Sequence, residues 1–353
     1  MFPTYVTPDK LLPMPTVEGP KLQPFDFGGK EDIDFLDPIM IDEEGALTSF
    51  VVQASIGGRV YALKLFKFHP FYHWGQWPYG RPIPDGEELY DHWEFFINEC
   101  RAYGRLKEAG REDLAAKCHG YFFLKEEDEK VLEDKYGLDP SAWDIDDARK
   151  DASSKDGQYR PIRVLVKDFV PGDIDFHPRQ IPRMLQDLIS IQNLGLVVGD
   201  MKRDAYVNGV LVDFSHSMTT PHPAITPGMA PGICDRLVAE QAFHNSRGDF
   251  QEFDWIIDYW NNNDGLKRGF IWHRALANYR YVGKIRSKDP AKKIPRAHKL
   301  DGLVSRCNPR VYDWKASGSV GGVRKPRRCT RWVFWSEQFS DLVVSPPPPP
   351  PNP

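Results

Sequence analysis

Two carboxylates, Asp200 and Asp213, are the side chains of this chain best placed to do chemistry. Lys202 follows the first of them, and Asn208-Gly209 separates two short apolar runs before the second. Asn-Gly favours a two-residue hairpin, because both residues tolerate positive φ. The hairpin brings the carboxylates to one end, where they repel each other unless a cation lies between them. Mg²⁺ carrying phosphates suits such a pair, since it binds one or two carboxylates and little else from a protein. The alternative is an ordinary surface hairpin with scattered acids.

A lysine and a glutamate farther upstream form a second candidate pair. Lys64 interrupts the apolar run 60–66, which predicts a buried strand. A buried lysine needs an anionic partner. Glu99 offers one, because it lies within the apolar stripe of a helix predicted over 88–108 and ended by Gly110. We therefore expect an ion pair between strand and helix, with Asp213 nearby.

Other interpretations of these two residues stay open. Lys64 could extend its ammonium group to solvent from a strand edge, as lysines often do. Glu99 could lie at the margin of the stripe and be held by Arg101 or Arg105.

The order of the predicted elements favours one fold class. A strand pair is predicted over 118–124 and 162–169, and an amphipathic helix runs from Ile181 to Gly195, just before Asp200. The order of these elements resembles the two-lobed α+β fold of protein kinases. The order is a strand with Lys64, a helix with Glu99, a pair of strands, a second helix and the hairpin that leads to Asp213. That resemblance implies ATP and Mg²⁺ as cofactors. It implies cofactor contacts for Lys64, Glu99 and Gly45, a metal ligand in Asp213, and catalytic roles for Asp200 and Lys202.

Several positions depart from the pattern of an active kinase. The residue five after Asp200 should be a metal-binding asparagine, but it is Ala205, and only the adjacent Asp204 could substitute. The candidate phosphate-covering segment 42–50 has Gly45 as its single glycine, and acids precede it. Acids near a phosphate site are repulsive. Gly199 stands where an arginine is usual, and Ser215 replaces a glycine. Three of these changes weaken catalysis more than they weaken the fold.

Five segments of the chain resemble the fungal kinetochore subunit family called Fta-two, from the Sim-four complex. The family is itself kinase-like, and the resemblance extends over about residues 17–316. The first and last segments are not general kinase motifs, so the resemblance is fairly specific. It implies protein partners in a kinetochore-type complex. The segments are Gly19–Phe27, Tyr61–Phe66, Glu99–Leu106, Asn208–Ser215 and Pro309–Trp314.

Composition agrees with a nuclear or cytoplasmic protein that is neither secreted nor membrane-bound. The chain has 353 residues, 41% hydrophobic and 13% aromatic, enough for the core of one two-lobed domain. Its net charge of −4 argues against broad attraction to nucleic acid or anionic membranes. Its five cysteines lack paired spacing and indicate reduced thiols. Residues 1–20 are proline-rich without the apolar run of a secretory signal, and no apolar stretch is long enough to span a membrane.

The expected organisation is a flexible N-terminus over 1–16, a kinase-like domain over 17–316 and a disordered tail over 317–353. Within the domain, the N-lobe covers about 17–170, and a shortened C-lobe covers about 171–316. The main helix of the C-lobe is predicted at 253–260, where Asp254 either supports the loop at Asp200 through backbone amides or faces solvent. Aromatic and histidine residues in the insertion 69–93 indicate a cover over the small lobe or a partner surface, and a metal site formed by His69, His73 and His92 is a further alternative. The segment 126–159 is predicted to hold one helix and then a flexible acidic loop. The tail carries a basic cluster at 324–331, which predicts either a nuclear import signal or a contact to nucleic acid. It ends in a polyproline run, Pro346–Pro351.

Three functional interpretations follow from these features. The first is a pseudokinase, a kinase-like interaction module that can retain nucleotide binding. The second is an active ATP-dependent phosphotransferase that uses Lys64, Glu99, Asp200 and Asp213. The third is a nucleic-acid adaptor that binds through its basic tail. Mg-ATP binding separates the first two, and salt-dependent DNA binding tests the third.

Overall fold

The structure is a computed structural model that describes residues 12–15, 17–29, 32–40, 48–69, 92–145, 148–149, 160–172, 176–230, 235–265, 271 and 275. Gly45, most of the aromatic insertion, the segment 309–314 and the tail 317–353 lie outside these ranges. The expectations for those segments therefore remain sequence predictions.

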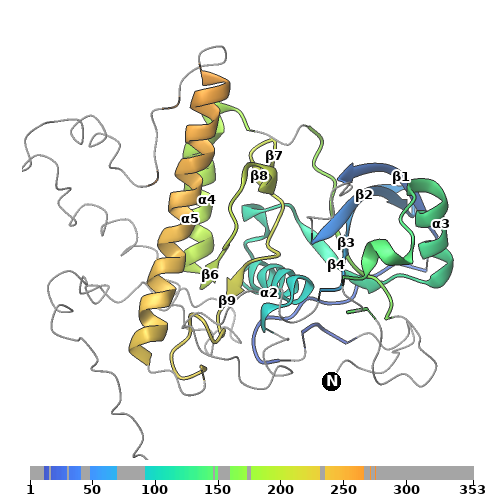
Figure 1. Ribbon diagram of the computed structural model, residues 1–353, viewed down its shortest axis with the longest axis horizontal. Coiled ribbons are helices and arrows are strands. Elements are labelled where there is room, and N and C mark those ends of the chain that lie inside the picture. The colour runs from blue at the N-terminus through green and yellow to red at the C-terminus, as the bar shows by residue number, and fades with distance from the viewer. Residues whose placement is uncertain are drawn as a thin grey trace, which may run out of the picture.

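A five-stranded antiparallel sheet forms one side of the molecule, with the strand order β1-β2-β3-β5-β4 (Figure 1). Gly57 and Gly58 connect the second and third strands with positive φ angles of 61° and 84°. The strand predicted around Lys64 is β3, and the predicted strand pair is β4 and β5, so both predictions are confirmed. The strands are β1 (Ile33–Met40), β2 (Ser49–Ile56), β3 (Arg59–Phe66), β4 (Cys118–Phe123) and β5 (Arg163–Asp168).

Helices α2 (Phe95–Glu108) and α3 (Glu126–Tyr136) pack on opposite faces of this sheet. The first begins later than predicted, because the Glu94 carboxylate caps it by accepting a hydrogen bond from the Ile97 N–H. The second confirms the helix predicted in the charged segment. The flexible loop predicted after it is partly wrong, since Trp143 is 1% exposed and packs in the core beside Phe50.

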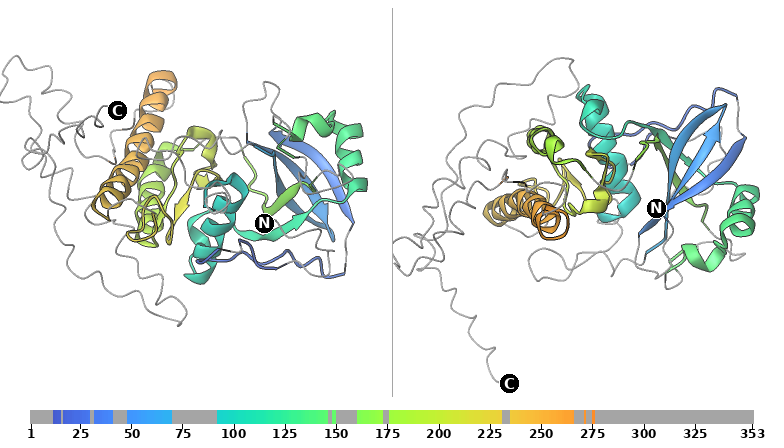
Figure 2. Two further views of the ribbon diagram at one scale, coloured as in Figure 1. Left: turned by 60° about the horizontal axis from the view of Figure 1, so that its bottom comes forward. Right: turned by 90° about the horizontal axis from the view of Figure 1, so that it is seen from above.

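The other side of the molecule is largely helical. Helix α4 (Ile181–Asn193) confirms the predicted amphipathic helix, and α5 (Asp235–Asn263) is much longer than the predicted helix at 253–260. Figure 2 shows α2 between the sheet and these two helices. One apolar core runs from α2 through α4 to α5, so the two sides are not separate in their packing. None of the described helices is long and apolar enough to cross a membrane. The predicted α+β class is confirmed.

The N-terminal strap, defined as residues 12–15 and 17–29, packs across α2 and β4. Met14, which the sequence places in a flexible N-terminus, is 7% exposed and pairs with Leu22. At Gly104 of α2 a Cβ atom would lie 2.8 Å from the backbone of Lys21. The strap therefore needs a glycine beneath it, which gives a structural reason for two of the segments that carry the family resemblance.

Two short antiparallel pairs lie beside the helices. One joins β6 (Leu196–Val197) to β9 (Met218–Thr219), and the other is the hairpin of β7 (Tyr206–Val207) and β8 (Val210–Leu211). Asn208 and Gly209 have φ angles of 47° and 73°. The predicted two-residue turn is thus confirmed.

We expect Gly209→Val to destabilise the protein by about 1 kcal/mol or more, because a β-branched residue resists positive φ. A Cβ atom there would also lie 2.7 Å from Gln180 Cδ. Urea unfolding measures the change. Gly248→Ala is the control, because that glycine lies in α5 with open space around it and alanine favours helix. An unchanged midpoint for Gly209→Val would contradict the role assigned to the turn.

Candidate functional site

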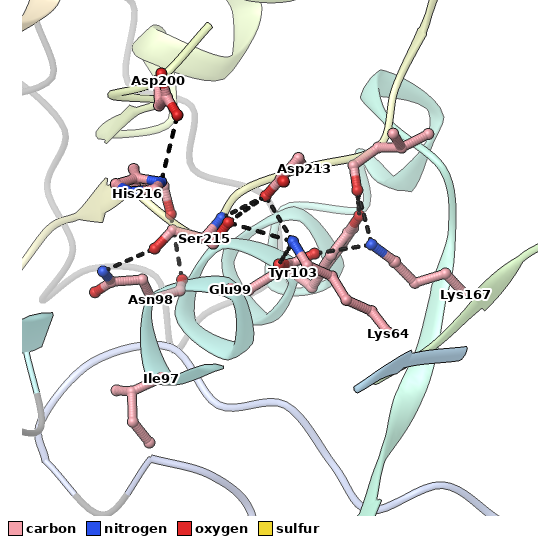
Figure 3. Close-up of polar contacts among 12 residues, drawn as sticks. Lys64, Ile97, Asn98, Glu99, Tyr103, Lys167, Asp200, Asp213, Ser215 and His216 are labelled. Atoms are coloured by element: carbon pink, nitrogen blue, oxygen red, sulfur yellow. Dashed lines mark hydrogen bonds and ion pairs between the residues drawn. The ribbon is translucent and has the colours of Figure 1, made fainter. Parts of the chain in front are cut away.

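Lys64 of β3 and Glu99 of α2 form the expected ion pair (Figure 3). The Lys64 Nζ lies 2.7 Å from Glu99 Oε2, and their side chains are 3% and 0% exposed. Burial alone would lower the pKa of Lys64, but the charges of Asp213 and Glu99 raise it above its ordinary value. Lys64 therefore stays charged inside the protein and does not extend to solvent.

Arg101 and Arg105 do not hold Glu99, so that alternative is wrong. The Arg101 guanidinium donates to Glu18 O and Thr219 O, both at 3.1 Å, and also to Pro221 O. Arg105 donates to Leu194 O at 3.2 Å and to Thr220 O at 2.6 Å. Both arginines thereby attach α2 to backbone carbonyls on the helical side of the molecule, and Arg101 also attaches it to the N-terminal strap.

A second lysine, Lys167, also contacts Glu99, and sequence reasoning missed it. Its Nζ lies 3.0 Å from Glu99 Oε1 and donates to Val212 O at 2.8 Å. The signal was present, because Lys167 ends an apolar strand much as Lys64 interrupts one. The same argument about a buried cation applied to both residues.

Asp213 lies where the sequence predicts, beside Lys64. Its Oδ1 accepts hydrogen bonds from Lys64 Nζ at 2.8 Å, Ser215 N at 2.7 Å and Ser215 Oγ at 2.6 Å. The side chain is nevertheless 40% exposed. Burial works against the charged form, but the charges of Lys64 and Lys167 hold the pKa of Asp213 below its ordinary value. Ser215, which replaces a glycine, thus supplies a hydroxyl that helps to orient this carboxylate.

Asp200 lies in the same region but contacts other partners. Its Oδ2 is 2.7 Å from Lys202 Nζ and 3.6 Å from His216 Nδ1. Each of the two carboxylates therefore has its own lysine, and repulsion between them is relieved in this way. His216 packs against Phe95, with 4.8 Å between the ring centroids. Sequence reasoning did not identify His216 as part of this region.

Two acids of α5 support the backbone around Asp200. Asp249 accepts hydrogen bonds from Val198 N at 3.0 Å and Gly199 N at 2.9 Å, and Glu252 accepts one from Met201 N at 2.8 Å. Burial raises the pKa of Asp249 to about 6 and that of Glu252 to about 7.

The sequence left Asp254 two alternatives, support of the loop at Asp200 or a solvent-facing position, and both are wrong, because Asp254 is 4% exposed and bonds elsewhere. Asp254 instead accepts a hydrogen bond from Ala275 N at 2.7 Å. Position on the helix decides which acid supports the loop, because Asp249 lies five residues before Asp254 and therefore faces a different direction.

The structure shows how two positions that depart from the kinase pattern, Ala205 and Gly199, are packed. Ala205 is 3% exposed and presents only a methyl group. At Gly199 a Cβ atom would lie 2.3 Å from His216 O, and φ is 87°. An arginine at position 199 is therefore incompatible with the way this segment packs.

The histidines considered for a metal site do not gather in the described residues. His69 packs against Phe95, whereas His92 lies beside His222 with 5.7 Å between the ring centroids. His73 lies outside the described residues. Burial lowers the pKa of His92 to about 3, so its ring is neutral. Among the described residues, no group of three His, Cys, Asp or Glu side chains could hold a metal ion.

The model of a family described as kinetochore Sim4 complex subunit FTA2 matches residues 11–218. The chain belongs to this family. The resemblance drawn from the sequence is thus confirmed, and the FTA2 match includes the strap, Lys64, Glu99, Lys167, Asp200 and Asp213. Among solved structures, vaccinia related kinase 3 aligns over 89% of this chain and 88% of its own, at 11% identity and a TM-score of 0.34. No curated protein matches the chain.

Proposed function

We propose that this FTA2-family protein is a pseudokinase: a kinase-like subunit of a kinetochore complex that binds nucleotide and uses its fold to contact protein partners. The observation that carries the proposal is the Lys64–Glu99–Asp213 arrangement, with distances of 2.7 Å and 2.8 Å from Lys64 Nζ, combined with Ala205 at a metal-ligand position. The first feature suits phosphate binding, and the second removes one ligand that phosphoryl transfer requires.

A kinase-like fold is supported by order and placement together. The lysine is on β3, the glutamate is on α2, and β4 and β5 complete the antiparallel sheet before the chain enters α4. The loop with Asp200 and the hairpin before Asp213 follow in the order of a kinase catalytic loop and its metal-binding segment.

The residues present fit one Mg²⁺ ion brought in by a nucleotide. Asp213 is part-exposed, and its described hydrogen bonds all end on Oδ1, so we assign the metal contact to Oδ2. Mg²⁺ keeps several waters and needs only one or two carboxylates when phosphates supply the other ligands. The metal would neutralise phosphate charge, and Lys64 would hold a phosphate oxygen.

Binding of Mg-ATP tests the nucleotide part of the proposal. We expect ATP to raise the melting temperature, with a larger rise when Mg²⁺ is present, because a ligand that binds only the folded state stabilises it. Lys64→Met and Asp213→Asn should abolish the response. Lys117→Met is the matched control, since the Lys117 side chain is 50% exposed and 3.8 Å from its nearest acid. No response of the wild-type protein at millimolar ATP would overturn nucleotide binding.

The family description supports the assembly part of the proposal, and a nuclear setting follows from it. The described surface also carries Trp255 and Tyr259, one turn apart on α5 and 61% and 51% exposed. Exposed aromatic side chains are enriched at protein interfaces.

Co-purification with other subunits of the complex tests the assembly part of the proposal. Asp213→Asn should leave co-purification intact, whereas deletion of residues 69–79 should weaken it. The opposite pattern would favour the active phosphotransferase.

A further inference from the structure

Glu99 receives more positive charge than one ion pair requires. Lys64 contacts its Oε2 at 2.7 Å and Lys167 contacts its Oε1 at 3.0 Å, so each carboxylate oxygen has its own lysine. The Glu99 side chain is 0% exposed, and the two lysines are 3% and 5% exposed. Placing a second ammonium group in the interior is unfavourable unless opposite charges and hydrogen bonds compensate for its lost hydration.

The two lysines reach Glu99 from neighbouring strands. In the register of β3 and β5, Lys64 pairs with Leu165 and Ala62 pairs with Lys167. Directly paired residues of antiparallel strands place their side chains on the same face of the sheet, so both ammonium groups project toward α2. Figure 3 shows the Lys64 and Lys167 side chains converging on Glu99 from two directions.

Beyond Glu99, the partners of the two lysines differ. Lys64 contacts the Asp213 carboxylate at 2.8 Å, which is part-exposed. Lys167 donates to Val212 O at 2.8 Å, the backbone carbonyl directly before Asp213. Lys64 thus touches a group that a nucleotide and its metal ion would engage, whereas the described polar contacts of Lys167 are the buried Glu99 carboxylate and the part-buried backbone carbonyl of Val212.

The charges of the four groups balance, with two lysines and two carboxylates. If Lys64 turned toward a phosphate and Asp213 toward a metal ion, Glu99 would lose one cation. Without Lys167, it would then be a buried carboxylate with no partner, which is strongly unfavourable. With Lys167 in place, Glu99 stays paired whichever way Lys64 points.

We propose that Lys167 is a positioning residue that holds Glu99 charged and Val212 in place, so that Lys64 and Asp213 are free to engage a phosphate and its metal ion. The second half of this inference rests on the proposed nucleotide site. The first half concerns the protein alone and can be tested without nucleotide.

The first test follows stability against pH in the full chain, by urea unfolding between pH 5 and pH 8. Lys64→Met leaves Lys167 on Glu99, and Lys167→Met leaves Lys64, so neither single variant should show new pH dependence from Glu99. The double variant leaves Glu99 without a lysine, and burial then favours its protonated form. Asp213 loses the same two lysines, so the pH dependence that belongs to Glu99 is the part that Glu99→Gln removes. A folded-state pKa above the unfolded value adds stability at low pH and loses it as the pH rises through the folded pKa. The double variant should therefore become more stable, relative to wild type, as the pH falls.

Adding Glu99→Gln to the double variant should remove that pH dependence, and Lys117→Met should match wild type throughout. The inference would be overturned if Lys64→Met alone already showed a pH dependence that Glu99→Gln removes, since Lys167 would then not hold Glu99. It would equally be overturned if the double variant showed none.

The second test measures Mg-ATP affinity by calorimetry. We expect Lys167→Met to weaken binding about tenfold or more although Lys64 remains. Lys167→Arg should retain much of the affinity, because it keeps the charge. Unchanged affinity in Lys167→Met would overturn the link to nucleotide. Failure of the wild-type protein to bind would refute the nucleotide site and the second half of this inference, while leaving the pH result for Glu99 to stand or fall by itself.

Discussion

The purified wild-type protein will transfer no phosphate from Mg-ATP to a protein substrate above the level of its Asp200→Asn variant. Phosphoryl transfer depends on positioning and on metal ions that neutralise the developing charge. Ala205 offers no ligand for a second metal ion, and its side chain is buried. Glu43 and Glu44 precede Gly45 in the segment expected to cover the phosphates. Together, these losses should raise the barrier by several kcal/mol, a rate decrease of about 10²-fold or more.

Radiolabelled ATP and a generic acceptor protein provide the measurement, with Asp213→Asn as a second inactive reference. Ala205→Asn should not restore transfer by itself, because the acidic covering segment remains. Robust phosphorylation by the wild-type chain that disappears in both aspartate variants would favour the active phosphotransferase over the pseudokinase.

The second large effect concerns stability. We expect Arg101→Met to lower the free energy of unfolding by about 2 kcal/mol or more, because two buried carbonyl oxygens and a part-buried one lose their donor, and each unsatisfied buried group costs about 1–3 kcal/mol. Those carbonyls belong to Glu18, Thr219 and Pro221, so one side chain joins the N-terminal strap, α2 and the segment after Ser215. Arg101→Lys should recover only part of the loss, since an ammonium group cannot reproduce the planar guanidinium contacts.

Urea unfolding of these variants checks the expectation. Arg183→Met is the matched control, because Arg183 is 74% exposed and lies 3.5 Å from Asp187, and exposed ion pairs contribute little. If Arg101→Met unfolds at the same urea concentration as the control, the strap and α2 are held by other contacts.

Local chemistry was enough to predict much of the site. The Asn208-Gly209 turn follows from residues that accept positive φ, and both angles are positive in the structure. The Lys64–Glu99 pair follows from two charged residues on apolar faces, because burial forces opposite charges together. The order of elements then places Asp213 beside Lys64. In each case the physical cause lies within a few neighbouring residues, or in one strong requirement for charge neutralisation.

Several other partners far apart along the chain were decided only by the tertiary structure. The sequence offers α5 several acids, and helix direction selects Asp249 and Glu252 over Asp254 to support the loop at Asp200. Arg101 bonds a carbonyl 118 residues away, a choice that no local pattern encodes. Sequence pattern therefore determined which charges had to be neutralised, whereas three-dimensional packing decided which group neutralised each one. The reason is that a hydrogen bond is directional and short, and only the packed backbone brings donor and acceptor within reach.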